Sequence, residues 1–205
     1  MLKPILPLVV AALVSLLATP VPAGAQEFVV DGTHSSVTFK IRHLLTKVSG
    51  LYREFAGKIV YDADEPTASS VNFTIEADSI DTRNEKRDEH LRSPDFFDVA
   101  NHPQLTFNSI KVEAKGSDRL LVTGELSIRG VTKPITVPVE VLGVMKTPRA
   151  LKAGFQTSFT INRKDFGVSW NRMLDQGGVV LGDEVTIEID IEADGKLPDE
   201  AGAGE

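Results

Sequence analysis

The residues best suited to chemistry are the histidines and one short charged segment. The four histidines lie far apart, at His34, His43, His90 and His102. None has a second histidine at the spacing of a zinc-binding helix or knuckle, and residues 87–90 (RDEH) lack the second histidine of a zinc-protease motif. The sequence therefore predicts no metal site. A site assembled by the fold stays open, beside the simpler interpretation that these side chains bond to loops or cap a helix.

Acid–base chemistry has one candidate, in the same segment. Asp88 lies between Arg87 and His90, and a carboxylate beside an imidazole can transfer protons. An ion pair on a helix surface explains the same residues. The chain has no Gly-x-Ser-x-Gly motif, no phosphate-binding glycine loop and no cysteine, so common hydrolase, nucleotide and thiol sites lack support. We assign no catalytic residue and expect a protein that is not an enzyme.

Residues 1–25 have the layout of a secretory signal peptide. Lys3 is the only charge, an apolar stretch follows it, and residues 23–25 (AGA) fit the small-x-small cleavage rule. A membrane anchor is the alternative, but a spanning helix needs about 20 apolar residues, and prolines at positions 4, 7, 20 and 22 interrupt this stretch. We predict cleavage after Ala25 and a periplasmic or otherwise secreted protein, because no later segment is apolar enough to span a membrane.

Composition limits the partners and the domain count. The formal net charge is −7 at pH 7, which argues against nucleic acid and gives no reason to expect an anionic membrane as partner. Without cysteine, a secreted domain must be stabilised by its core alone. We expect one domain over residues 26–193 and a disordered, acidic tail over residues 194–205. A homodimer stays open.

Apolar and polar residues alternate along most of the mature chain. A period of two is that of a β-strand with one dry and one wet face. About eight stretches follow it. Their apolar positions are Val37, Phe39 and Ile41; Phe55, Ile59 and Tyr61; Val71, Phe73 and Ile75; Leu105, Phe107, Ile110 and Val112; Leu120, Val122, Leu126 and Ile128; Ile135, Val137, Val139 and Val141; Phe155, Phe159 and Ile161; and Val185, Ile187, Ile189 and Ile191. The pattern predicts an all-β fold, an antiparallel barrel or sandwich of about eight strands.

Several irregularities refine this picture. The alternation slips before Ile110, which indicates a β-bulge. Gly57 predicts a bulge or a close approach of another group, and Pro138 predicts an edge, a bulge or a gap in the wall because proline has no N–H. Residues 82–85 (TRNE) have capping-box spacing and predict a short helix over 84–91, which Pro94 ends. Residues 95–98 (DFFD) should fold over one end of the barrel.

The apolar interior is the remaining candidate for function. Phenylalanines recur on the apolar faces of the predicted strands. A filled core is the default explanation. A barrel of about eight strands can also keep space for one ligand, and periodicity does not distinguish the two.

Several motifs, in a fixed order, resemble those of the YceI-like polyisoprenoid-binding family, over residues 27–193. They are Thr33-His34-Ser35 before Phe39, Ser79-Ile80-Asp81-Thr82, Arg87-Asp88-x-His90-Leu91, Ser93-x-Asp95-Phe96-Phe97-Asp98, Pro103-x-Leu105-Thr106-Phe107, Gly124-x-Leu126-x-Ile128-x-Gly130-Val131-Thr132-Lys133-Pro134, Asn162-Arg163-x-Asp165-Phe166-Gly167 and Gly182-Asp183-x-Val185.

The resemblance implies a lipocalin-like antiparallel barrel with a short helix. It also implies an internal tunnel for a long-chain isoprenoid or similar lipid, such as a polyprenyl or quinone tail, and no other cofactor. The phenylalanines then become tunnel lining rather than plain core. The tunnel residues we predict are Phe39, Ile41, Phe73, Ile75, Phe107, Leu126, Phe155 and Phe159.

A polar end of the ligand needs partners at one mouth. The candidates are Arg87, Asp88, His90, Asn162, Arg163 and Trp170. Trp170 offers an amphipathic ring for a wet–dry boundary, and Arg163 has the alternative of bonding a carboxylate such as Asp165. The leading function is a carrier or sequestering protein for the lipid. The alternatives are an enzyme acting on an isoprenoid or ester at the mouth, through Asp88 and His90, and a packed structural barrel in stress protection or adhesion.

Overall fold

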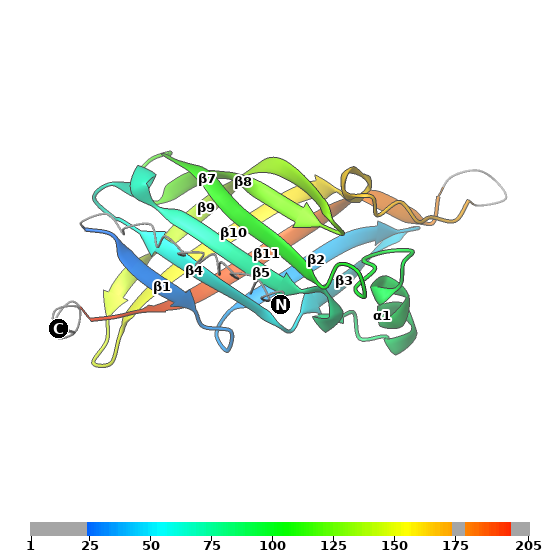
Figure 1. Ribbon diagram of the computed structural model, residues 1–205, viewed down its shortest axis with the longest axis horizontal. Helices are drawn as coiled ribbons and strands as arrows, with labels where there is room; N and C mark the ends of the chain where they lie inside the picture. Colours follow the sequence, from blue (N-terminus) through cyan, green and yellow to red (C-terminus); the bar gives the residue numbers. More distant parts are fainter. Residues whose placement is uncertain (1–23, 174–178, 198–205) are drawn as a thin grey trace, which may run out of the picture.

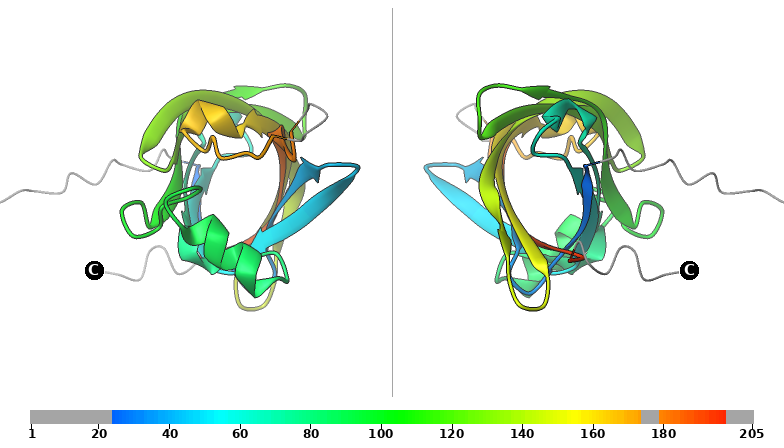
Figure 2. Two further views of the ribbon diagram at one scale, coloured as in Figure 1. Left: turned by 90° about the vertical axis from the view of Figure 1, so that its right-hand side faces the viewer. Right: turned by 90° about the vertical axis from the view of Figure 1, so that its left-hand side faces the viewer.

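A closed ring of eight antiparallel strands forms the body of the protein (Figures 1 and 2). A computed structural model describes residues 24–173 and 179–197. In spatial order the ring consists of β1 (Gln26–Val30), β4 (Phe55–Tyr61), β5 (Ser70–Glu76), β7 (Gln104–Ala114), β8 (Arg119–Ile128), β9 (Val131–Lys146), β10 (Leu151–Asn162) and β11 (Leu181–Gly195). The last strand, β11, pairs with β1 and closes the ring. The predicted all-β, lipocalin-like barrel is confirmed.

Three further strands extend the wall at one end. They are β2 (Ser36–His43), β3 (Thr46–Tyr52) and β6 (Ile80–Asp81), in the order β11-β2-β3-β6. The C-terminal residues 193–195 of β11 pair with β1, whereas its earlier residues, from Leu181 to Asp190, pair with β2. Figure 2 shows the β2–β3 hairpin leaving the ring on one side.

Among the described residues, one α-helix and three short 3-10 helices complete the fold. Helix α1 (Glu85–Arg92) lies at the end of the barrel near β3 (Figure 1), and η1 (Pro66–Ala68), η2 (Ala77–Ser79) and η3 (Arg163–Phe166) lie between strands. The cap of α1 is Asn84, whose side chain accepts from the Arg87 N–H at 3.1 Å. The helix is confirmed, but the capping box is wrong, because Thr82 is outside the helix and donates to Asp88 instead.

Two predicted irregularities occur where the sequence placed them. The β7–β8 register shifts between Ser109 and Lys111, which confirms the bulge. The bulged Ile110 is 66% exposed, so it points out of the barrel, while Val112 is buried. Gly57 causes no register shift, and an added Cβ there would lie 2.6 Å from the Phe73 ring. The close approach, not the bulge, is therefore correct.

Pro138 marks a gap between β9 and β10. The β9–β10 ladder runs from Lys146 to Val139 and ends there, one residue before the proline. The Thr157 hydroxyl donates to the Pro138 carbonyl at 2.6 Å, so this edge of β9 faces β10. Pro134 lies four residues earlier on β9, so its backbone nitrogen faces the same side as that of Pro138. The two prolines therefore remove two N–H donors from the edge of β9 that faces β10. The sequence predicted an edge, a bulge or a gap at Pro138, and the structure shows that the β9–β10 pairing ends there.

The chain ends fall partly outside the described residues. The predicted leader lies there except for Gly24 and Ala25, and so do residues 198–205 of the predicted tail. The tail prediction is wrong at its start, because Asp194 and Gly195 belong to β11 and pair with Val29 and Phe28. The Lys152 ammonium lies 2.5 Å from the Asp194 carboxylate and forms an ion pair with it. Within the described residues, no helix has the length and apolar character needed to cross a bilayer.

Candidate ligand-binding tunnel

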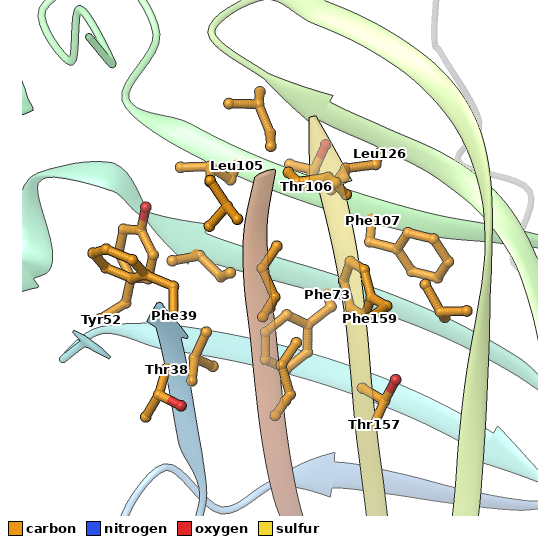
Figure 3. A pocket seen from close by; sticks show the side chains of 18 of the residues that line it. Thr38, Phe39, Tyr52, Phe73, Leu105, Thr106, Phe107, Leu126, Thr157 and Phe159 are labelled. Atoms are coloured by element: carbon orange, nitrogen blue, oxygen red, sulfur yellow. The ribbon is translucent and has the colours of Figure 1, made fainter. Parts of the chain in front are cut away.

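The barrel encloses a cavity of about 430 Å³ (Figure 3). Along β8 the cavity is lined from Leu120 to Ile128, a span of about 26 Å at roughly 3.3 Å per residue. Most of the side chains that line it are aliphatic or aromatic. Its volume lies within the range of about 300–1,000 Å³ that is typical of ligand pockets. The cavity is therefore an elongated apolar tunnel.

The sequence located the wall of this tunnel well. All eight predicted tunnel residues line the cavity: Phe39, Ile41, Phe73, Ile75, Phe107, Leu126, Phe155 and Phe159. Leu126 and Phe155 are buried, whereas the other six are only partly buried. That they contact a ligand stays a prediction.

Glycines on neighbouring strands explain how large rings line the tunnel without closing it. Phe39 pairs with Gly50, and Phe73 pairs with Gly57. An added Cβ would lie 2.4 Å from the Phe39 ring at Gly50 and 2.6 Å from the Phe73 ring at Gly57. Each ring therefore lies flat over a position without a side chain, an arrangement that also stabilises a glycine in a strand. The tunnel stays open because the rings follow its wall.

Helix α1 and the segment after η3 form one mouth of the tunnel. Of the six predicted head-group residues, Arg87, His90, Arg163 and Trp170 line the cavity. The rings of His90 and Trp170 pack edge to face, with centroids 5.0 Å apart. His90 and Trp170 thus form an aromatic rim at the mouth, and their ring nitrogens are polar.

Arg87 is the cation best placed to meet a polar ligand group. Its Nε donates to the Thr82 hydroxyl at 2.6 Å and its Nη2 to the Thr82 carbonyl at 2.8 Å. Among the described residues its Nη1 has no hydrogen-bond partner. Arg87 therefore keeps donors for an anion or a carbonyl oxygen.

Asp88 and Asn162 do not reach the tunnel. Asp88 is 5% exposed and accepts from the Thr82 N–H at 3.0 Å and from its hydroxyl at 2.5 Å. Asn162 caps η3 by accepting from the Lys164 N–H at 3.0 Å. Neither lines the cavity, so neither is placed to contact a head group. Both side chains satisfy backbone groups instead.

Arg163 lines the mouth, but its guanidinium bonds the protein. Nε donates to the Gly182 carbonyl at 2.8 Å, and Nη1 donates to the carbonyls of Val168 and Trp170 at 2.7 and 2.8 Å. Its carboxylate partner is Asp183 at 3.3 Å, not the predicted Asp165. Burial lowers the pKa of Arg163, and the nearby Asp183 opposes that shift. The arrangement fastens the segment that carries Trp170.

Sequence reasoning missed other residues of the wall. Tyr52, Tyr61 and Leu91 line the cavity, as do the neighbouring Phe96 and Phe97. The positions of Phe96 and Phe97 in the lining confirm that residues 95–98 fold over the end of the barrel. Tyr52 had no signal in the sequence, because it ends a strand with few apolar residues.

A cluster with metal-ligating atoms lies away from the tunnel. One ligand atom each from Asp31, His34 and Glu192 lie within 4.8 Å of one another. The Lys152 ammonium is 3.0 Å from Glu192 and 3.5 Å from Asp31, so a cation already neutralises these carboxylates. The Asp31 hydrogen bond raises the pKa of His34. We therefore interpret the cluster as a surface ion-pair network.

The residues around the tunnel match a known family. The YceI-like domain matches residues 28–193. A UPF0312 protein of Shewanella baltica (strain OS185) is 41% identical over 158 residues, which are 75% of this chain and 82% of that protein.

Solved structures show the same barrel. Burkholderia cenocepacia BcnA superposes with a TM-score of 0.70 at 26% identity, covering 80% of this chain and 98% of that chain. A polyisoprenoid binding domain from Saccharophagus degradans, implicated in plant cell wall breakdown, gives a TM-score of 0.61 at 16% identity and covers 82% of this chain and 98% of that one. The latter likeness shows the fold alone. The chain belongs to the YceI-like family.

Proposed function

We propose that this protein holds one long apolar chain, an isoprenoid or a similar lipid, in its tunnel and carries or sequesters it. The observation that carries the proposal is the elongated cavity with a nearly all-apolar wall. A tunnel of this kind excludes water from a hydrocarbon chain without any covalent step. The polyisoprenoid binding domain of Saccharophagus degradans, which shares the fold, supports the same class of ligand.

The hydrophobic effect is large enough for such binding. Removing about 500 Å² of lipid surface from water at roughly 25 cal/mol/Å² gives on the order of 12 kcal/mol before the costs of ordering are subtracted. A packed structural barrel would have no such cavity, so the open tunnel favours the binding function over that alternative.

We propose that the polar end of the ligand lies at the mouth beside α1. Arg87 supplies donors there, and His90 and Trp170 supply an aromatic rim. The enzyme alternative needed Asp88 and His90 as an acid–base pair. On the helix these residues are two apart and do not face each other. Asp88 bonds Thr82, whereas His90 Nε2 lies 2.9 Å from Asp95. The pair is not assembled, and we propose a binding protein.

We also propose that the protein works in the periplasm after cleavage behind Ala25. The predicted signal peptide supports this location. A long lipid is insoluble in an aqueous compartment, so a shielding carrier is useful there.

A titration tests the proposal. Trp170 is the only tryptophan of the chain and lies at the mouth, so its fluorescence reports occupancy. Prenyl alcohols of increasing chain length should bind with 1:1 stoichiometry, and affinity should rise with length until the tunnel is filled. Affinity that does not depend on chain length would contradict a tunnel-bound tail. In a Leu126→Trp variant the larger side chain projects from the wall into the tunnel, so this variant should bind long chains more weakly than the wild type does.

A further inference from the structure

Both tyrosines of the chain line the tunnel, one near each end. Tyr52 belongs to the apolar cluster that contains Phe96, and Tyr61 packs edge to face on Phe155 in the second cluster. Tyr52 is 7% exposed as a residue, and its hydroxyl makes no side-chain hydrogen bond among the described residues. The hydroxyl is not one of the fully enclosed polar atoms that lack a partner, so it borders open space in the tunnel, where a ligand group can reach it.

The described neighbours of Tyr52 in the wall are apolar. Its ring centroid is 5.8 Å from that of Phe39 and 6.3 Å from that of Phe97. On the neighbouring strands it pairs with Val37 and Ile80. Figure 3 shows Tyr52 and Phe39 together in the wall of the tunnel. Burial raises the pKa of Tyr52, so its hydroxyl stays protonated and can donate.

Tyr52 lies at the same end of the tunnel as Arg87. Gly50 precedes Tyr52 by two residues on β3 and faces Thr82, because an added Cβ at Gly50 would lie 2.9 Å from the Thr82 methyl group. Thr82 in turn accepts from Arg87. The Tyr52 hydroxyl and the Arg87 guanidinium therefore offer hydrogen-bond donors to one region, which suits an acceptor oxygen.

We propose that the Tyr52 hydroxyl donates a hydrogen bond to an acceptor oxygen on the end of the bound chain. The ligand class is an apolar chain with an oxygen-bearing end, either a neutral carbonyl, as in a quinone, or a phosphate. This inference rests on the proposed function and adds a polar subsite to it. A hydrocarbon without oxygen fills the tunnel but leaves this hydroxyl without a partner.

The test is the Tyr52→Phe variant, which removes one oxygen and keeps the ring. Three probes are titrated against the full mature chain by Trp170 fluorescence: squalene, a quinone with a long prenyl tail, and a long-chain prenyl phosphate. We expect Tyr52→Phe to bind at least one oxygen-bearing probe about tenfold more weakly and squalene unchanged within about twofold. A loss for the quinone identifies a carbonyl partner, and a loss for the phosphate identifies an anionic one.

The opposite results overturn the inference. Equal affinities in wild type and variant, or an equal loss for all three probes, would remove the hydrogen bond. A larger loss in Tyr61→Phe than in Tyr52→Phe would place the acceptor at the other end of the tunnel. The unliganded Tyr52→Phe protein should unfold at the same urea concentration as the wild type, because the Tyr52 hydroxyl has no hydrogen-bond partner within residues 24–173 and 179–197. If the wild type binds none of the probes, the proposed function fails, and this inference fails with it. If the wild type binds the oxygen-bearing probes and Tyr52→Phe binds them with the same affinity, this inference alone is contradicted.

Discussion

Replacing Arg163 should unfold the protein more readily rather than weaken a head-group contact. The guanidinium donates to three carbonyl oxygens, and its side chain is 5% exposed. Arg163→Ala leaves those three acceptors without their donor. Each unsatisfied buried acceptor costs about 1–3 kcal/mol, and partial access of water to the loop lowers the sum, so we expect a loss of about 4 kcal/mol in the free energy of unfolding.

Urea unfolding measures this loss. Circular dichroism follows the barrel, and fluorescence follows Trp170, whose carbonyl Arg163 holds. With a slope of about 2 kcal/mol/M, a loss of 4 kcal/mol lowers the midpoint by about 2 M. Arg87→Ala is the matched comparison, since its hydrogen bonds go to Thr82 alone and it should cost about 1–2 kcal/mol. An Arg163→Ala midpoint within about 0.5 M of the wild type would refute the structural role.

Three further predictions concern other parts of the molecule. Asp88→Asn should lower the free energy of unfolding by about 2 kcal/mol in urea titrations, because a neutral amide accepts its two hydrogen bonds less well than a carboxylate; unchanged stability would contradict this. Gly124→Ala should destabilise the barrel by about 1–3 kcal/mol and weaken lipid binding, since an added Cβ lies 2.5 Å from the Phe107 ring and pushes it into the tunnel; wild-type values of both would contradict the close approach. His34→Gln should lower the free energy of unfolding, because the charged imidazole of His34 bonds Asp31. In urea titrations at several pH values, this loss should be largest below about pH 6.5 and should shrink as pH rises through the raised pKa of His34. A loss that grows with pH would refute the pairing.

The sequence predicted the strands of the barrel better than the residues at its mouth. Period-two alternation locates a strand that has one apolar face, and β8 shows this along its whole length. The alternation did not predict strand β3, because its inward positions include Gly50, which has no side chain to continue the pattern. Strand β1 was missed because it has only 5 residues and follows the predicted leader directly.

The mouth was harder because spacing does not tell where a polar side chain points. Asp88 and Asn162 stand in the same motifs as Arg87 and Arg163, yet both bond nearby groups instead of facing the tunnel. Local hydrogen bonds to backbone N–H groups compete with ligand contacts for short polar side chains. Tyr52 shows the converse, since only the fold brings this isolated residue into an apolar wall.

The most direct test of lipid binding in the tunnel is the identity of what the purified protein holds. The full chain is expressed in a bacterial host, purified without detergent, extracted with organic solvent and analysed by mass spectrometry. We expect one long-chain lipid with an oxygen-bearing end, near one molecule per protein, and its loss from a Leu126→Trp variant that still folds. Absence of any long-chain lipid from the wild type, together with no uptake when prenyl lipids are added, would contradict lipid binding.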